Sequence, residues 1–165
     1  MGKSGGEWDT VPENDVFRGA NQLTLDAKGR VVMPTRYRER LVERSAGRLV
    51  VTIDRDQCLL LYPLPDWEEI ERKLMRLPSL NEAARRLQRL MVGHATDVEL
   101  DGHGRVLLPP KLREFAALSR DAVLIGQGNR FELWDEARWN ERRDAWLKEG
   151  GPQGSLTGDL ETLSL

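Results

Sequence analysis

The chain has 165 residues and a net charge of −2, with 32% charged and 39% hydrophobic residues, a balance typical of a globular protein of one domain or of two small units. The sequence contains no apolar run long enough to cross a bilayer, residues 1–16 lack the apolar core of a signal peptide, and Cys58 is its one cysteine. These features exclude an intrachain disulfide and a cysteine-based zinc site, and they predict a cytoplasmic protein with no membrane partner and no cofactor.

The near-neutral total hides an uneven distribution of charge. Residues 1–16 carry a charge of −3, and we predict that they form a disordered N-terminal extension. Residues 17–48 carry +5, because eight basic residues are opposed by three acidic ones. Local positive charge of this kind is what phosphate binding requires. The basic residues of this segment are Arg18, Lys28, Arg30, Arg36, Arg38, Arg40, Arg44 and Arg48.

An internal repeat organises the rest of the chain. The segment LTLDAKGRVVMPTRYRERL (23–41) matches VELDGHGRVLLPPKLREFA (98–116) at an offset of 75 residues. Downstream, LVVTIDRDQCLLLY (49–62) parallels AVLIGQGNRFELW (122–134). Matches in this order predict two copies of one unit, over residues 17–65 and 93–148. The matched positions include Asp26 with Asp101, Gly29 with Gly104, and Arg30 with Arg105.

Each copy is predicted to hold four short strands and one short helix. In the first copy a strand leads into a turn at Gly29, a second strand follows, and Pro34 opens the helix before two further strands. Because a unit of about 45 residues has too little core to be stable alone, we expect the copies to interleave and to bury each other's apolar faces. The predicted strands are 23–25, 31–33, 49–53, 58–62, 98–100, 106–108, 122–126 and 130–134, and the predicted helices are 35–44 and 110–117.

Residues 66–92 are predicted to form a helical connector between the copies. Its first helix carries an apolar stripe that ends at Pro78, and Ser79 with Glu82 has the form of a capping box for the second helix. We expect the basic residues of these helices to form a solvated face, and salt bridges to a neighbouring subunit are the alternative.

After the second copy, Asp135 is expected to cap a helix that carries Trp139 and Trp146. We expect the tryptophans to pack in the core or at a subunit interface rather than to stack on bases. Residues 149–165 are predicted to form a flexible tail.

The repeated Asp-x-x-x-Arg element runs from Asp26 to Arg30 and from Asp101 to Arg105, at a turn that we expect at the tip of a hairpin. Aspartate opens such turns by accepting hydrogen bonds from its own downstream backbone. We therefore interpret both aspartates, with the glycines that follow them, as structural members of the motif.

The basic members of the motif are the candidate DNA-binding residues. Arginine can read guanine edges or hold phosphate with two hydrogen bonds, which favours Arg30, and Lys28 adds a second donor. Arg18 and Arg105 are further candidates. Because residues 92–116 carry a charge of −1, the second copy is expected to contribute less than the first.

Four blocks of the sequence resemble the MraZ family of bacterial transcriptional regulators: FRGANQLTLDAKGRVVMPTRYRERL, LLLYPLPDWEEIERKL, RRLQRLMVGHATDVELDGHGR and FELWDEARW. The resemblance runs from Phe17 to about Trp146. It implies an α+β fold in which two tandem AbrB-like swapped-hairpin units form a β-barrel core joined by two connecting helices. It also implies a ring-shaped homo-oligomer that binds double-stranded DNA at short repeated boxes in the nucleoid.

The family resemblance further implies a repressor that acts on the promoter of its own division and cell-wall gene cluster, with no small-molecule substrate. The family's Asp-x-x-x-Arg motif maps onto the two turns described above. Two alternatives remain: an antitoxin-like regulator of the AbrB type, and a ring-shaped scaffold that binds DNA without sequence preference. Neither an enzyme nor a metal site is predicted, because His94, Asp97, Asp101 and His103 lack regular ligand spacing.

Overall fold

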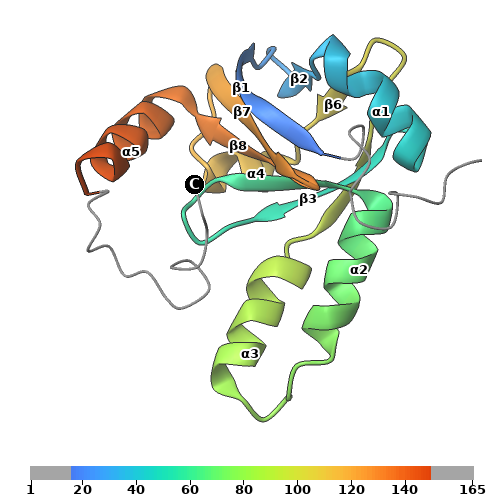
Figure 1. The fold of residues 1–165 in the computed structure, drawn as a ribbon, viewed down its shortest axis with the longest axis vertical. Coiled ribbons are helices and arrows are strands. Elements are labelled where there is room, and N and C mark those ends of the chain that lie inside the picture. The colour runs from blue at the N-terminus through green and yellow to red at the C-terminus, as the bar shows by residue number, and fades with distance from the viewer. Residues whose placement is uncertain (1–15, 150–165) are drawn as a thin grey trace, which may run out of the picture.

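The computed structural model describes residues 16–149, so the predicted N-terminal extension up to residue 15 and the predicted tail from residue 150 lie outside the described residues. Within the described range the chain forms a mixed α+β fold, as predicted (Figure 1). The strands are β1 (Phe17–Thr24), β2 (Arg30–Val32), β3 (Arg48–Ile53), β4 (Leu59–Pro63), β5 (Thr96–Glu99), β6 (Arg105–Leu107), β7 (Asp121–Gly128) and β8 (Arg130–Asp135). The helices are α1 (Thr35–Ser45), α2 (Leu64–Met75), α3 (Glu82–Leu87), the π-helical η2 (Gln88–Val92), α4 (Pro110–Phe115) and α5 (Glu136–Glu149).

Six strands form one antiparallel sheet in the order β1-β7-β8-β4-β3-β5. The first strand of each copy pairs with the third strand of the other copy: β1 runs along β7, and β5 runs along β3. The expected interleaving of the copies is therefore confirmed. The sheet ends at β1 and β5, so its hydrogen bonds do not close it into the barrel that the family resemblance implies.

The remaining two strands, β2 and β6, form a separate two-stranded antiparallel sheet, which we call the ribbon. Val31 lies opposite Val106 at its centre, and both side chains are buried. The expected turn at Gly29 is formed, since Asp26 N donates to the Arg30 carbonyl at 3.0 Å, but β1 does not pair with β2, so the expected hairpin is wrong. The reason is that each three-residue strand satisfies its backbone groups on the equivalent strand of the other copy, which also buries the two valines together.

The main core lies between the two copies. It combines apolar side chains of α1, β3 and β4 with those of α4, β7 and β8. Phe17 and Tyr37 of the first copy meet Phe131 of the second, with ring centroids 4.4 Å (Phe17) and 4.9 Å (Tyr37) from that of Phe131. Neither copy buries these rings by itself, so each copy completes the core of the other.

The connector forms an arm of α2, α3 and η2 that extends from one edge of the body (Figure 1). Trp67 and Leu74 of α2 pack on Tyr62 and its neighbours in a second apolar cluster. The predicted capping box is wrong: the N-cap of α3 is Asn81, whose Oδ1 accepts a hydrogen bond from Ala84 N at 3.0 Å. A turn from Pro78 to Asn81 delays the start of the helix, because Asn81 N donates to the Pro78 carbonyl.

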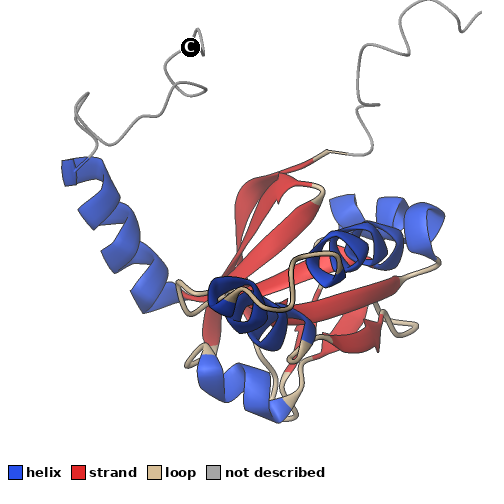
Figure 2. Cartoon of the chain, turned by 90° about the horizontal axis from the view of Figure 1, so that it is seen from below, coloured by secondary structure: helices blue, strands red, loops and turns tan. Residues whose placement is uncertain are grey.

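Helix α5 projects away from the sheet (Figure 2). Asp135 accepts a hydrogen bond from Arg138 N at 3.1 Å, which confirms the predicted cap. Trp134, which is 1% exposed, packs against Trp139 and Trp146 with ring centroids 5.7 Å and 5.9 Å away, so packing is their observed role within the chain. Across residues 16–149, no helix has both the length and the apolar character needed to span a membrane.

Candidate nucleic-acid interface

The turn of the first copy is closed by the carboxylate of Asp26. Its Oδ1 accepts hydrogen bonds from the backbone nitrogens of Lys28 at 3.0 Å and Arg30 at 2.9 Å, and its Oδ2 accepts one from Arg30 Nε at 2.7 Å. Gly29 adopts a φ of +85°, which glycine reaches without steric cost. The aspartate therefore has the structural role that the sequence predicts, and it also orients the arginine.

The turn of the second copy repeats this geometry. Asp101 Oδ1 accepts from the backbone nitrogens of His103 at 2.8 Å and Arg105 at 2.9 Å, while Oδ2 accepts from Arg105 Nε at 2.8 Å. Gly104 has a φ of +74°. Equivalent atoms of the two turns therefore make the same hydrogen bonds.

Both carboxylates are stabilised in their charged form. The backbone N–H of Arg30 holds the pKa of Asp26 below its ordinary value, and the backbone N–H of Arg105 lowers the pKa of Asp101 to about 2. Each carboxylate therefore stays ionised at neutral pH and keeps its arginine in place.

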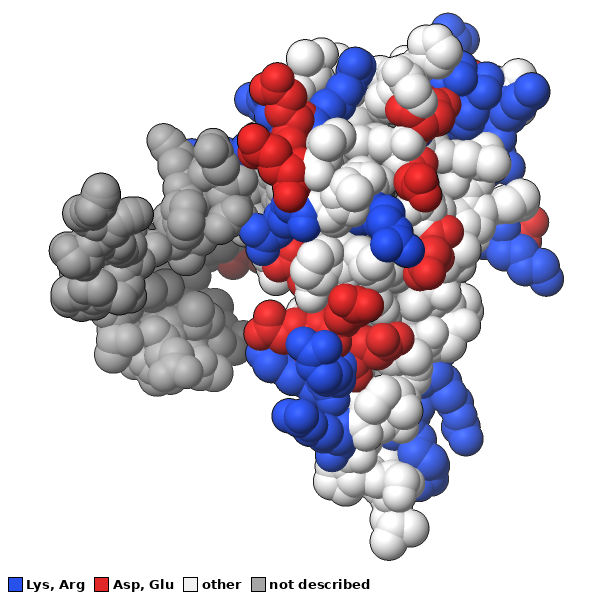
Figure 3. All heavy atoms as spheres, turned by 90° about the vertical axis from the view of Figure 1, so that its right-hand side faces the viewer, with Lys and Arg blue, Asp and Glu red and all other residues white. Residues whose placement is uncertain are grey.

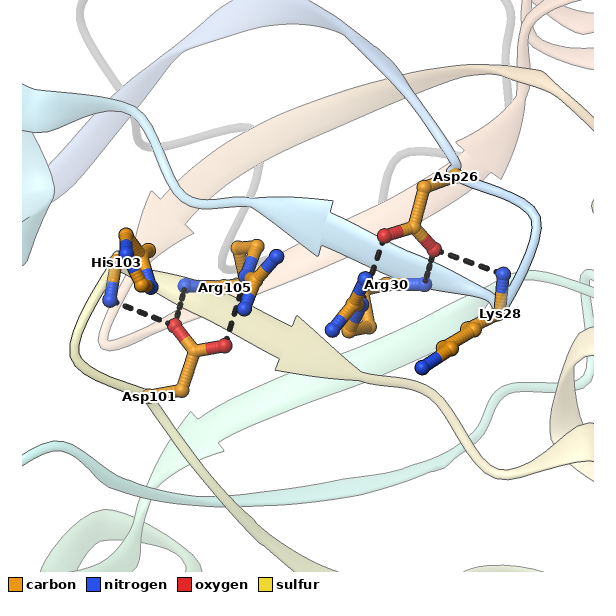
Figure 4. Close-up of polar contacts among 6 residues, drawn as sticks. All are labelled: Asp26, Lys28, Arg30, Asp101, His103 and Arg105. Carbon is orange, nitrogen blue, oxygen red and sulfur yellow. Dashed lines mark hydrogen bonds and ion pairs between the residues drawn. The ribbon is translucent and has the colours of Figure 1, made fainter.

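The two turns lie at opposite ends of the ribbon, and their arginines lie between them on one face (Figure 4). The carboxylates engage Nε of each guanidinium, so its two terminal amino groups have no hydrogen-bond partner within residues 16–149. The side chains of Arg30 and Arg105 are 26% and 30% exposed. The structure thus brings three of the four candidates together, since Lys28 lies in the first turn beside Arg30.

The fourth candidate, Arg18, lies away from the ribbon. It is near the start of β1, opposite Gln127, and six residues before Thr24 at the end of that strand. A strand rises about 3.3 Å per residue, which separates Arg18 from the turn by roughly 20 Å. Arg18 therefore does not belong to the cluster that the two turns form.

Two arginines that the sequence analysis did not single out support the turns from the opposite copy. Arg113 packs over Gly29 so closely that a side chain at Gly29 would collide with its guanidinium, and Arg38 packs over Gly104 in the same way. Arg38 Nε also donates to the Met33 carbonyl at 2.7 Å. The match of Arg38 to Arg113 in the repeat was the signal that could have identified this pair.

Charge of both signs covers the outer face that α1 and α2 line. Figure 3 shows lysine and arginine interspersed with aspartate and glutamate over its upper and middle parts, and lysine and arginine over the α2–α3 arm at its lower end. Charges mixed in this way are typical of a solvated surface. Among residues 16–149, no group of three or more histidine, cysteine or acidic side chains is placed to hold a metal ion.

Taken together, the fold and the site define an internally duplicated, strand-exchanged α+β protein that presents two arginine turns on one face. The chain matches the family model described as the antitoxin-like MraZ protein over residues 16–90 and 91–147. It is 58% identical to a transcriptional regulator MraZ of Thioalkalivibrio sulfidiphilus over 150 residues, which cover 91% of this chain and 100% of that relative. Relatives with the same name from Halorhodospira halophila and Pseudomonas aeruginosa are each 57% identical, again over 91% and 100% of the two chains. The chain belongs to the MraZ family.

Proposed function

We propose that this chain is a sequence-specific DNA-binding transcriptional regulator, and not an enzyme, that represses the promoter of its own division and cell-wall gene cluster. The observation that carries the proposal is the ribbon, which presents Arg30, Arg105 and Lys28 on one face. A two-stranded ribbon fits the major groove of B-DNA, and a guanidinium held at Nε has two terminal amino groups left for a guanine edge. The names of the relatives, each a transcriptional regulator, support the same function.

We also propose that the units 17–65 and 93–148 are the two AbrB-like swapped-hairpin units, joined by the connector 66–92. A single ribbon makes few contacts and should bind weakly. A ring-shaped homo-oligomer would present several ribbons to successive short boxes, and the raised effective concentration would multiply the affinity. Exposed apolar side chains away from the ribbon support such self-assembly, and they include Val42, Met75, Leu80, Leu87 and Leu90. We also propose that the protein is cytoplasmic and associates with the nucleoid.

Replacing Arg30 by alanine tests the proposal. The Arg30→Ala variant should lose about 5- to 150-fold in affinity for each box of its own upstream DNA that a ribbon binds, the range expected for one bidentate guanine contact. Arg105→Ala should lose less, because the second copy is the less basic one. Gel shifts and fluorescence anisotropy at several salt concentrations measure this loss, with circular dichroism to show that each variant is folded.

The matched control is Arg72→Ala, which removes an exposed arginine from the connector arm. It should leave the affinity unchanged. Equal binding of the intact protein to upstream and scrambled duplexes would contradict the proposal and favour the scaffold alternative. Light scattering of the intact protein tests the ring separately.

A further inference from the structure

The ribbon exposes two large apolar side chains between its arginines. Val32 is 45% exposed and Leu107 is 55% exposed, whereas Val31 and Val106 between the outward residues are buried. Because side chains alternate along a strand, Val32 lies on the same face as Arg30, and Leu107 on the same face as Arg105. The outward face of the ribbon is therefore half basic and half apolar.

The pairing register arranges these four side chains as a two-by-two patch. Arg30 lies opposite Leu107, and Val32 lies opposite Arg105. Side chains directly opposite one another on an antiparallel pair have Cβ atoms about 5 Å apart. Each arginine therefore has an apolar neighbour from the other copy. Lys28 and Leu107 also line one surface hollow of about 440 Å³, which places the basic turn beside the apolar patch.

An exposed apolar residue occurs at the same position in both copies, so these two residues are not scattered surface residues. Val32 and Leu107 occupy equivalent positions at the offset of 75 residues that relates the copies. The outward side of a solvated two-stranded sheet normally carries polar residues. An apolar residue at this position in both copies indicates a surface that becomes covered, and the flanking Arg30, Arg105 and Lys28 indicate that the covering partner is negatively charged.

We propose that Val32 and Leu107 contact thymine methyl groups in the DNA major groove while Arg30 and Arg105 contact neighbouring guanines. The inference rests on the proposed DNA-binding function and names the bases that the site reads. The methyl group of thymine is the apolar group that base edges offer in that groove. Outward residues of one strand are about 6.6 Å apart, close to two base-pair steps of about 6.8 Å, so an arginine and the apolar residue of the same strand reach base pairs two steps apart.

Replacing thymine by uracil in the upstream duplex tests this inference, because it removes the methyl group and leaves every hydrogen-bonding group in place. Fluorescence anisotropy with the intact protein should show a loss of about fourfold for each contacted methyl, the factor that corresponds to about 0.8 kcal/mol. Val32→Ala and Leu107→Ala should each bind the thymine and uracil duplexes equally at the position they contact, in a double-mutant cycle.

The matched control is Leu147→Ala, since Leu147 is 76% exposed on α5 and lies outside both the ribbon and the residues proposed for self-assembly. This variant should keep the full difference between thymine and uracil. Preferential binding of upstream DNA with no uracil effect at any position would overturn the inference and leave the proposed function standing. Absence of any preference for upstream DNA would overturn both. If Val32→Ala lowers the mass measured by light scattering and keeps the uracil effect, the patch covers a second copy and the inference is wrong.

Discussion

Each aspartate of the two turns accepts hydrogen bonds from the turn that it opens, and this explains how an exposed carboxylate fixes the direction of an arginine. The lowering of the pKa is clearest at Asp101, because the backbone N–H of Arg105 lowers the pKa of its carboxyl group to about 2. A carboxylate whose pKa is depressed in the folded state stabilises that state fully above its ordinary pKa of 3.8, and the contribution is lost as the pH falls through about 2. The hydrogen bonds that close the turn therefore depend on the ionised form of the aspartate.

We predict that the Asp101 carboxyl group titrates with a midpoint near pH 2, since the hydrogen bonds from Arg105 and His103 favour its charged form. Carbon chemical shifts of the side-chain carboxyl, followed by NMR between pH 6 and about pH 1.5, measure the midpoint. The Asp101→Asn variant identifies the resonance by its loss. A midpoint at the ordinary value of 3.8 would contradict the hydrogen-bonded turn.

At the level of single residues, the sequence predicted the geometry of the candidate site in part. The Asp-x-x-x-Arg spacing was enough to predict the turn-closing role of Asp26 and Asp101, because that role depends on residues only four apart. It gave no reason to separate Arg18 from the cluster, since that separation depends on the length of β1. The exposed Val32 and Leu107 were missed because an isolated apolar residue in a short strand is predicted to be buried.

At the scale of the element, each turn is completed by an arginine from the opposite copy. Gly104 combines a φ of +74° with a guanidinium, that of Arg38, lying where a side chain would be. Two costs follow from adding a methyl group there: the left-handed backbone becomes strained, and Arg38 must move away from the turn. Gly102, two residues earlier in the same turn, has open space around it.

We predict that Gly104→Ala destabilises the fold by at least about 1–2 kcal/mol, the cost of the left-handed conformation for a residue with a side chain. Gly102→Ala is the matched control and should leave the free energy of unfolding within about 0.5 kcal/mol of the original. Urea unfolding of the three proteins measures both differences. Equal midpoints for Gly104→Ala and Gly102→Ala would rule out the cross-copy support of the turn.

The boundaries of the helices and strands show where local sequence patterns are sufficient to predict the start of an element. Helix α1 begins at the predicted Thr35, directly after Pro34, and α5 is capped by the predicted Asp135. The start of α3 was wrong because two N-cap candidates, Ser79 and Asn81, stand two residues apart, and a turn at Pro78 decides between them. Strand β1 is longer than predicted, since its pairing with β7 orders polar residues that have no apolar alternation.

At the scale of the whole molecule, the exchange of strands makes the two copies one folding unit. The interleaving of the two copies was predictable from the small size of each copy. The choice of strand partners was not predictable, because many pairings of eight short strands bury similar surface. The structure pairs β1 with β7 and β5 with β3, and it places one core between the copies. Neither copy has a complete sheet without the other.

We predict that the chain unfolds in one cooperative transition, so that a destabilising substitution in the first copy shifts the unfolding midpoint of the second copy by the same amount. Leu41→Ala removes a fully buried side chain of α1 and should cost about 2–5 kcal/mol. Fluorescence of the tryptophan cluster around Trp134, in the second copy, should report the same shift in midpoint as circular dichroism of the whole backbone. Leu147→Ala, at a side chain 76% exposed on α5 and outside the residues proposed for self-assembly, is the matched control and should change stability by no more than about 0.5 kcal/mol. Two separate midpoints for Leu41→Ala, compared at one protein concentration, would mean that the copies unfold independently despite their exchanged strands.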